Sequence, residues 1–140
     1  MRNKTLATLG LLALLAATSA FGQQRLRFDI PFEFHVGNVV MPAGQYNVDL
    51  STSGRQDALS LASSGRRTGA YALTYRIGRD DAHSERSRLV FNKYGETYFL
   101  SEALPANGMG SALPKSKTER ELPRSASLAP TSQVVLVARR

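Results

Sequence analysis

The sequence contains no cysteine and no tryptophan, and its only histidines are His35 and His83. Without cysteine the chain can form no disulfide, no thiolate nucleophile and no lipid-modified thiol. The scarcity of histidine restricts general bases and metal ligands, because imidazole is the side chain that titrates near neutral pH. No apolar run reaches the roughly 20 residues that a membrane-spanning helix requires. Any fold of this chain must therefore be stabilised by packing and backbone hydrogen bonds.

The start of the chain has the composition of a secretory signal peptide. Basic residues come first, an uncharged and mostly apolar run of about a dozen residues follows, and small residues then precede two glutamines. We predict cleavage between Gly22 and Gln23. Residues 1–22 would then be a signal peptide and residues 23–140 a single domain, exported to the periplasm or the extracellular medium.

The chain carries a net charge of +7, but its basic residues are dispersed among acidic ones. Only Arg66-Arg67 and Arg139-Arg140 are adjacent basic pairs. This pattern is more typical of a solvated surface than of a nucleic-acid site, so we do not expect nucleic acid as a partner. An anionic envelope surface or another protein remains a candidate partner.

Alternation of apolar and polar residues is the main structural signal. Over residues 25–34 every second residue is apolar, from Leu26 to Phe34, which predicts a half-buried strand. Pro31 lies on the polar face of this strand and cannot donate a ladder hydrogen bond. It therefore indicates an edge position or a bulge.

Further strands are expected wherever short apolar or alternating runs are separated by turn signals. These runs cover residues 39–41, 45–50, 58–62, 70–75, 88–91, 97–100 and 133–138, with a loop over 51–56. The last run is apolar throughout, which indicates a strand that is buried on both faces and closes the sheet near the first strand. The pattern predicts an all-β fold, an antiparallel β-sandwich or small β-barrel of about seven to eight strands.

One short helix is expected in the C-terminal half. Residues 113–122 contain helix formers, and Ser116 with Glu119 fits a capping box. Pro123 would end this helix. The segment is basic, but its apolar face is too small to hold a membrane, so a solvated cap over the sheet is favoured.

The aromatic side chains allow two interpretations. Most of Tyr71, Tyr75, Tyr94, Tyr98 and Phe99 occupy strand positions. They could form a stacking platform for sugars or bases, but core packing is the favoured interpretation. Tyr94 lies at a predicted turn and is the one expected to be exposed.

The loop from Asp80 to Glu85 is the best catalytic-looking cluster. Asp81, His83 and Glu85 could hold a divalent metal if they converged with ligands from another segment. A solvated loop is favoured, because neighbouring arginines would neutralise these carboxylates. His35 is interpreted as a histidine on the surface or at a strand end. We therefore assign no catalytic residue, no metal site, no cofactor and no ligand-binding residue.

Three segments resemble a group of small, uncharacterised, exported β-rich proteins of bacteria. They are a PF-x-F-x-VG … PAG-x-Y-x-V opening (Pro31–Val48), an LVF-x-x-YG-x-x-YFLS hairpin (Leu89–Ser101) and an LP-x-S-x-x-ER-x-L helix (Leu113–Leu122). The resemblance covers most of the chain after residue 22. It implies export and a β-rich fold, but no activity or site residue.

These observations favour a non-enzymatic structural or interaction protein of the envelope or the medium. One alternative is a small-ligand carrier, with an apolar pocket lined by Phe28, Tyr46 and Phe91. A second is a metal-assisted hydrolase that uses the Asp80 to Glu85 loop. A third is pairing of a partner chain with an exposed first strand.

Overall fold

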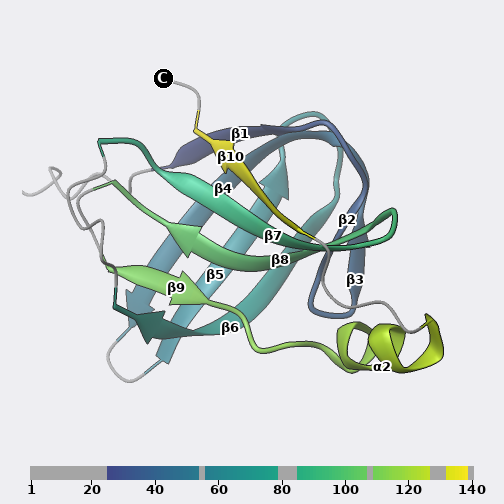
Figure 1. Ribbon diagram of the computed structural model, residues 1–140. Coiled ribbons are helices and arrows are strands. Elements are labelled where there is room, and N and C mark those ends of the chain that lie inside the picture. Colours follow the sequence, from purple (N-terminus) through teal and green to yellow (C-terminus); the bar gives the residue numbers. More distant parts are fainter. Residues whose placement is uncertain (1–24, 54–55, 79–84, 107–108, 127–131, 139–140) are drawn as a thin grey trace, which may run out of the picture.

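The computed structural model describes residues 25–53, 56–78, 85–106, 109–126 and 132–138 (Figure 1). The predicted signal peptide and its cleavage between Gly22 and Gln23 lie outside these residues. Among the residues described, no helix has the length and apolarity needed to cross a bilayer.

The described chain is all-β with one short helix, as the alternation predicted. The strands are β1 (Leu26–Ile30), β2 (Phe34–Val36), β3 (Val39–Met41), β4 (Gly44–Ser53), β5 (Gln56–Ser63), β6 (Gly69–Ile77), β7 (Arg88–Tyr94), β8 (Thr97–Leu104), β9 (Gly110–Ala112) and β10 (Ser132–Val137). The helix is α2 (Lys117–Ala126), which continues through Pro123, so the expectation that this proline ends the helix was wrong.

The strands form one ten-stranded sheet that folds over on itself (Figure 1). Its main path runs β1-β4-β5-β6-β9-β8-β2-β3, and β8 also pairs with β7, which pairs with β10. All of these ladders are antiparallel except a single parallel pair between His35 of β2 and Phe99 of β8. Figure 1 shows β4 and β5 behind β7 and β8, whereas β6 curves forward to pair with β9; the core residues come from both groups of strands.

The core is centred on aromatic side chains. The ring of Phe34 makes edge-to-face contacts with Tyr46 and Phe91, at centroid distances of 5.3 and 5.5 Å. Phe32 packs from the side, stacked on Tyr98 at 4.0 Å and edge-to-face on Phe91 at 5.3 Å. Such rings add specific geometry to the stabilisation from burial, which is about 25 cal/mol per Å² of apolar surface.

The predicted strand over residues 25–34 is interrupted at Pro31. β1 ends at Ile30, and the chain re-enters the sheet as β2 at Phe34, beside β3 and β8 rather than beside β4. The expected edge position or bulge was therefore wrong, since proline ends the strand here. The predicted burial is nevertheless retained, because Phe28, Ile30 and Phe34 all remain in the core.

Two tight hairpins depend on glycine. Gly37 connects β2 to β3 and Gly95 connects β7 to β8, each with a φ of 60°. This left-handed conformation is accessible to glycine at little steric cost. The loop predicted over residues 51–56 is shorter than expected, because β4 continues to Ser53 and β5 begins at Gln56.

The final strand, β10, lies next to the first. Its six residues pair with β7, and its backbone also runs close to β1 (Figure 1). Leu136 of β10 packs against the core. This position agrees with the expectation that the last strand approaches the first.

Candidate functional site

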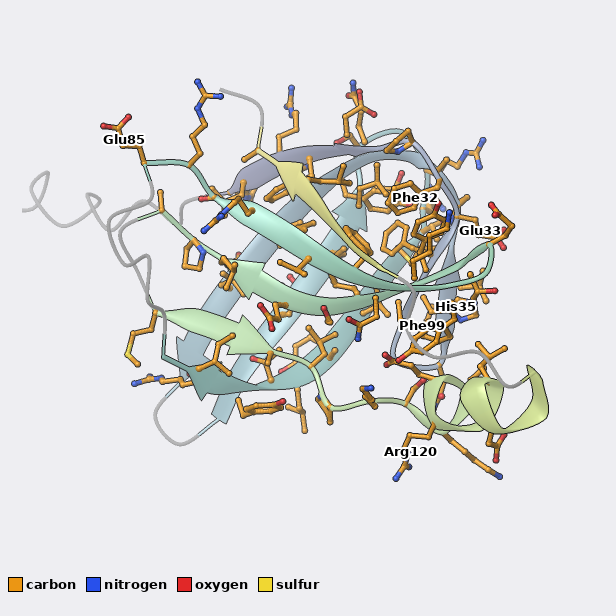
Figure 2. The ribbon with its side chains drawn as sticks, viewed as in Figure 1. Phe32, Glu33, His35, Glu85, Phe99 and Arg120 are labelled. Atoms are coloured by element: carbon orange, nitrogen blue, oxygen red, sulfur yellow. The ribbon has the colours of Figure 1, made fainter. Side chains whose placement is uncertain are left out.

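The weak metal candidates Asp81, His83 and Glu85 lie mostly outside the described residues. Asp81 and His83 lie outside them, and Glu85 is exposed. Figure 2 shows Glu85 at the opposite end of the molecule from His35, so these two side chains cannot share a site. Within the described ranges, no three His, Cys, Asp or Glu side chains are grouped so that they could hold a metal ion.

His35 is the half-buried middle residue of the three-residue strand β2. Its imidazole stacks on the ring of Phe99, with centroids 4.6 Å apart and planes inclined by 21° (Figure 2). Phe99 is itself buried and contacts Tyr94 edge-to-face at 5.8 Å. The histidine therefore covers an aromatic residue on the outer side of the sheet.

A buried polar cluster lies beneath helix α2. The carboxylate of Glu119 is only 4% exposed. It accepts hydrogen bonds from Nδ2 of Asn92 at 2.9 Å and from the phenol of Tyr94 at 3.1 Å. Nζ of Lys115 donates to the same phenol at 3.2 Å, and this hydrogen bond raises the pKa of Lys115 above its usual value. The expectation that Tyr94 is exposed at a turn tip was wrong, because the helix segment covers it.

Residues from three motif-bearing segments (Pro31–Val48, Leu89–Ser101 and Leu113–Leu122) lie in this cluster or in the aromatic contacts next to it. His35 comes from the first segment, Tyr94 and Phe99 from the second, and Ser116 and Glu119 from the third. The Ser116 hydroxyl accepts the backbone N–H of Glu119 at 3.1 Å, as the capping box predicts. The Glu119 side chain contacts β7 instead of completing the box. These residues attach the helix to the sheet, which is a structural role.

A shallow groove of about 340 Å³ lies between two turns on another part of the surface. It is lined by residues 42–46 and 63–66, which are mostly polar or small. The Tyr46 phenol donates to the carbonyl of Pro42 at 2.5 Å. Burial raises the pKa of Tyr46, and the positive charge of Arg66 partly opposes that shift. The groove is open and polar, and does not resemble the enclosed apolar pocket of the carrier hypothesis.

The third feature is an apolar row on the outer face of β6. Tyr71, Leu73 and Tyr75 are 66%, 52% and 54% exposed. Core packing was the expectation for these tyrosines, and it was wrong. The alternate residues Ala70 and Ala72 face the core instead. We call Tyr71, Leu73 and Tyr75 the β6 row.

The neighbouring strands place smaller and more polar residues beside the β6 row. In the β5–β6 ladder, Tyr71 is opposite Ser60 and Leu73 is opposite Ala58. In the β4–β5 ladder, Ser60 is in turn opposite Asp49. Directly opposed residues in antiparallel strands share a face. Ser60 and Ala58 therefore lie next to the β6 row on the outer face, and Asp49 of β4 lies beyond Ser60.

The comparisons with known proteins provide no relative from which a role could be transferred. No family model matches the sequence, and neither the curated proteins nor the solved structures include a match. The function must therefore be argued from the surface and the buried groups described above.

Proposed function

We propose that this protein is exported from a bacterial cell and acts without catalysis, as a binding protein of the envelope or the extracellular medium. The β6 row is the surface that contacts its partner. Export is supported by the positive start, the short apolar run and the small residues before Gln23.

The exposure of the β6 row is the observation that carries the proposal. Three consecutive outward positions of one strand hold large apolar side chains, and each is at least half exposed. Single exposed apolar residues are ordinary, whereas contiguous ones mark interaction surfaces. Tyrosine suits such a surface, since its ring provides apolar contact area and its hydroxyl tolerates water.

In two clusters outside the β6 row, the polar groups are hydrogen-bonded to each other. Glu119, Tyr94 and Asn92 bind one another and hold α2 on the sheet. Asp57 and Arg76 form an ion pair with 2.8 Å between Oδ2 and Nε. Engagement of these groups with each other favours a binding role over a catalytic one.

The alternatives have less support. Phe28, Tyr46 and Phe91, suggested as the lining of a carrier pocket, belong to the packed core cluster. β1 is flanked by β4 and runs close to β10, which leaves its edge less accessible to a partner strand. The hydrolase depends on Asp81 and His83, which lie outside the described residues.

Site-specific photocrosslinking in the native host tests the binding proposal. We would replace Tyr71 with a photoreactive phenylalanine and, as a control, place the same residue at Arg120, which is exposed on α2 (Figure 2). We expect a discrete adduct from position 71 and none from position 120. Equal labelling at the two positions, or none at either, would refute the proposal.

Export is tested separately. The protein recovered from the periplasm or the medium should begin at Gln23 by N-terminal sequencing. A chain that retains Met1 and stays in the cytoplasm would contradict the export part of the proposal.

A further inference from the structure

We infer that the β6 row binds a neutral polysaccharide, with successive pyranose rings lying along the strand. This inference rests on the proposed function and specifies its partner. The C–H face of a pyranose ring is apolar and flat enough to cover an aromatic ring, whereas its hydroxyl groups project from the rim. A fitting surface therefore has aromatic side chains in line and hydrogen-bonding groups at their side.

The length of the row suits a linear chain. Tyr71 and Tyr75 are four residues apart on one strand, which is about 13 Å at the usual rise per residue. Leu73 lies between them on the same outward face. The row can therefore contact several consecutive units of an extended polymer.

Polar groups are available beside the row. Ser60 lies opposite Tyr71 in the ladder, and Asp49 lies opposite Ser60. Ala58, opposite Leu73, is buried and small. The surface next to Tyr71 and Leu73 therefore consists of short side chains, and the hydroxyl of Ser60 and the carboxylate of Asp49 can reach the hydroxyls of a bound sugar.

The charge distribution favours a neutral ligand. Within the ladder of β5 and β6, the charged residues are Asp57 and Arg76, which occupy the positions that alternate with the β6 row. They are paired with each other through two contacts, of 2.8 and 3.3 Å. No net charge from these two strands is directed at the row, so an anionic polymer would gain little attraction from them.

The size of the row argues against a protein partner or a second copy. A tyrosine buries roughly 150–250 Å² when fully covered, and the two tyrosines here expose 66% and 54%. Together with Leu73 they provide on the order of 300–400 Å². A stable protein interface needs about 800 Å² from each partner. A narrow oligosaccharide can bind on an area of this size, through stacking and rim hydrogen bonds.

The test uses neutral hexasaccharides as probes. We would titrate the protein with hexamers of β-1,4-glucose, β-1,4-xylose, β-1,4-N-acetylglucosamine, β-1,3-glucose and α-1,4-glucose, and measure binding by calorimetry. Tyrosine emission provides a second signal, since the chain has five tyrosines and no tryptophan. We expect at least one probe to bind the wild-type protein.

Variants of the β6 row then locate the site. Tyr71→Ala and Tyr75→Ala should each weaken binding about tenfold, the loss expected from one stacking contact. Tyr71→Phe should bind within about threefold of wild type because the ring is retained. Met109→Ser, which changes another exposed apolar residue, should have no effect. Unchanged circular dichroism and urea midpoints would show that the variants fold.

Two results would overturn the glycan inference. One is the absence of binding to all five probes, and the other is binding that Tyr71→Ala and Tyr75→Ala leave intact. If the photocrosslink at position 71 then identifies a protein or a second copy of this chain, the inference is wrong while the proposed function stands. If position 71 labels nothing beyond the Arg120 control, both are wrong.

Discussion

The phenol of Tyr94 donates a hydrogen bond to the buried carboxylate of Glu119, with 3.1 Å between the two oxygens. This contact joins β7 to helix α2 across 25 residues of chain. A buried carboxylate without partners would be strongly destabilising. The helix can therefore bury Glu119 only because Asn92 and Tyr94 of β7 donate hydrogen bonds to it.

Removal of this carboxylate should destabilise the fold. We expect Glu119→Ala to lower the free energy of unfolding by about 1–3 kcal/mol, because Asn92 and Tyr94 lose their shared acceptor. Glu119→Gln should cost less, since the amide oxygen can still accept. Glu121→Ala, at an exposed position of the same helix, should change it by no more than about 0.5 kcal/mol. Urea denaturation measures all three, and similar losses for Glu119→Ala and Glu121→Ala would contradict this role.

Two leucines on adjacent strands test which face of the sheet is covered. Leu59 of β5 is fully buried, whereas Leu73 of β6 is about half exposed. We expect Leu59→Ala to lower the free energy of unfolding by about 2–5 kcal/mol and Leu73→Ala by less than about 1 kcal/mol. Thermal or urea unfolding provides the comparison. Equal losses would mean that the β6 row is packed inside.

The phenol of Tyr46 should lose its proton at a higher pH than an ordinary tyrosine does. Burial raises its pKa above 10.0, so the folded state favours the neutral phenol. The resulting stabilisation is fully present below the unfolded pKa and is lost as the pH rises through the folded value. We expect an ultraviolet phenolate titration of the native protein to show a late component that is missing in Tyr46→Phe.

The charge of Arg66 acts on the pKa of Tyr46 in the direction opposite to burial. Its positive charge lowers the pKa of Tyr46 and partly opposes the effect of burial. Arg66→Gln should therefore shift the late component to still higher pH. A shift to lower pH, or no late component in the wild-type protein, would contradict this assignment.

The ion pair between Asp57 and Arg76 should contribute modestly and depend on salt. The Asp57 side chain is 11% exposed and that of Arg76 is 50% exposed, so solvent screens only part of the attraction. We expect Arg76→Met to lower the urea midpoint of unfolding at low ionic strength, since Asp57 would lose its partner. The loss should shrink in 1 M salt. A loss that is independent of salt would indicate a packing effect of the arginine stem.

Much of the local structure could be predicted because it depends on neighbouring residues. The alternation from Leu26 to Phe34 correctly identified core residues even though Pro31 divides the strand. The Ser116 cap could also be predicted from the sequence, since it involves residues only three apart. The hydrogen-bond partners of Glu119, Asn92 and Tyr94, could not be predicted, because they lie on a strand that is distant from Glu119 in sequence.

Most strands, the helix cap and the absence of disulfides could be predicted from short stretches of sequence, because period, capping chemistry and composition are local properties; the break at Pro31 and strand β9 could not. Which side of β6 faces water depends on the fold of the whole sheet. Alternation shows that Tyr71, Leu73 and Tyr75 share a face, and it shows the same for the residues between them. Which face is buried depends on where the rest of the sheet folds over, and here it covers Ala70 and Ala72 and leaves the larger side chains exposed.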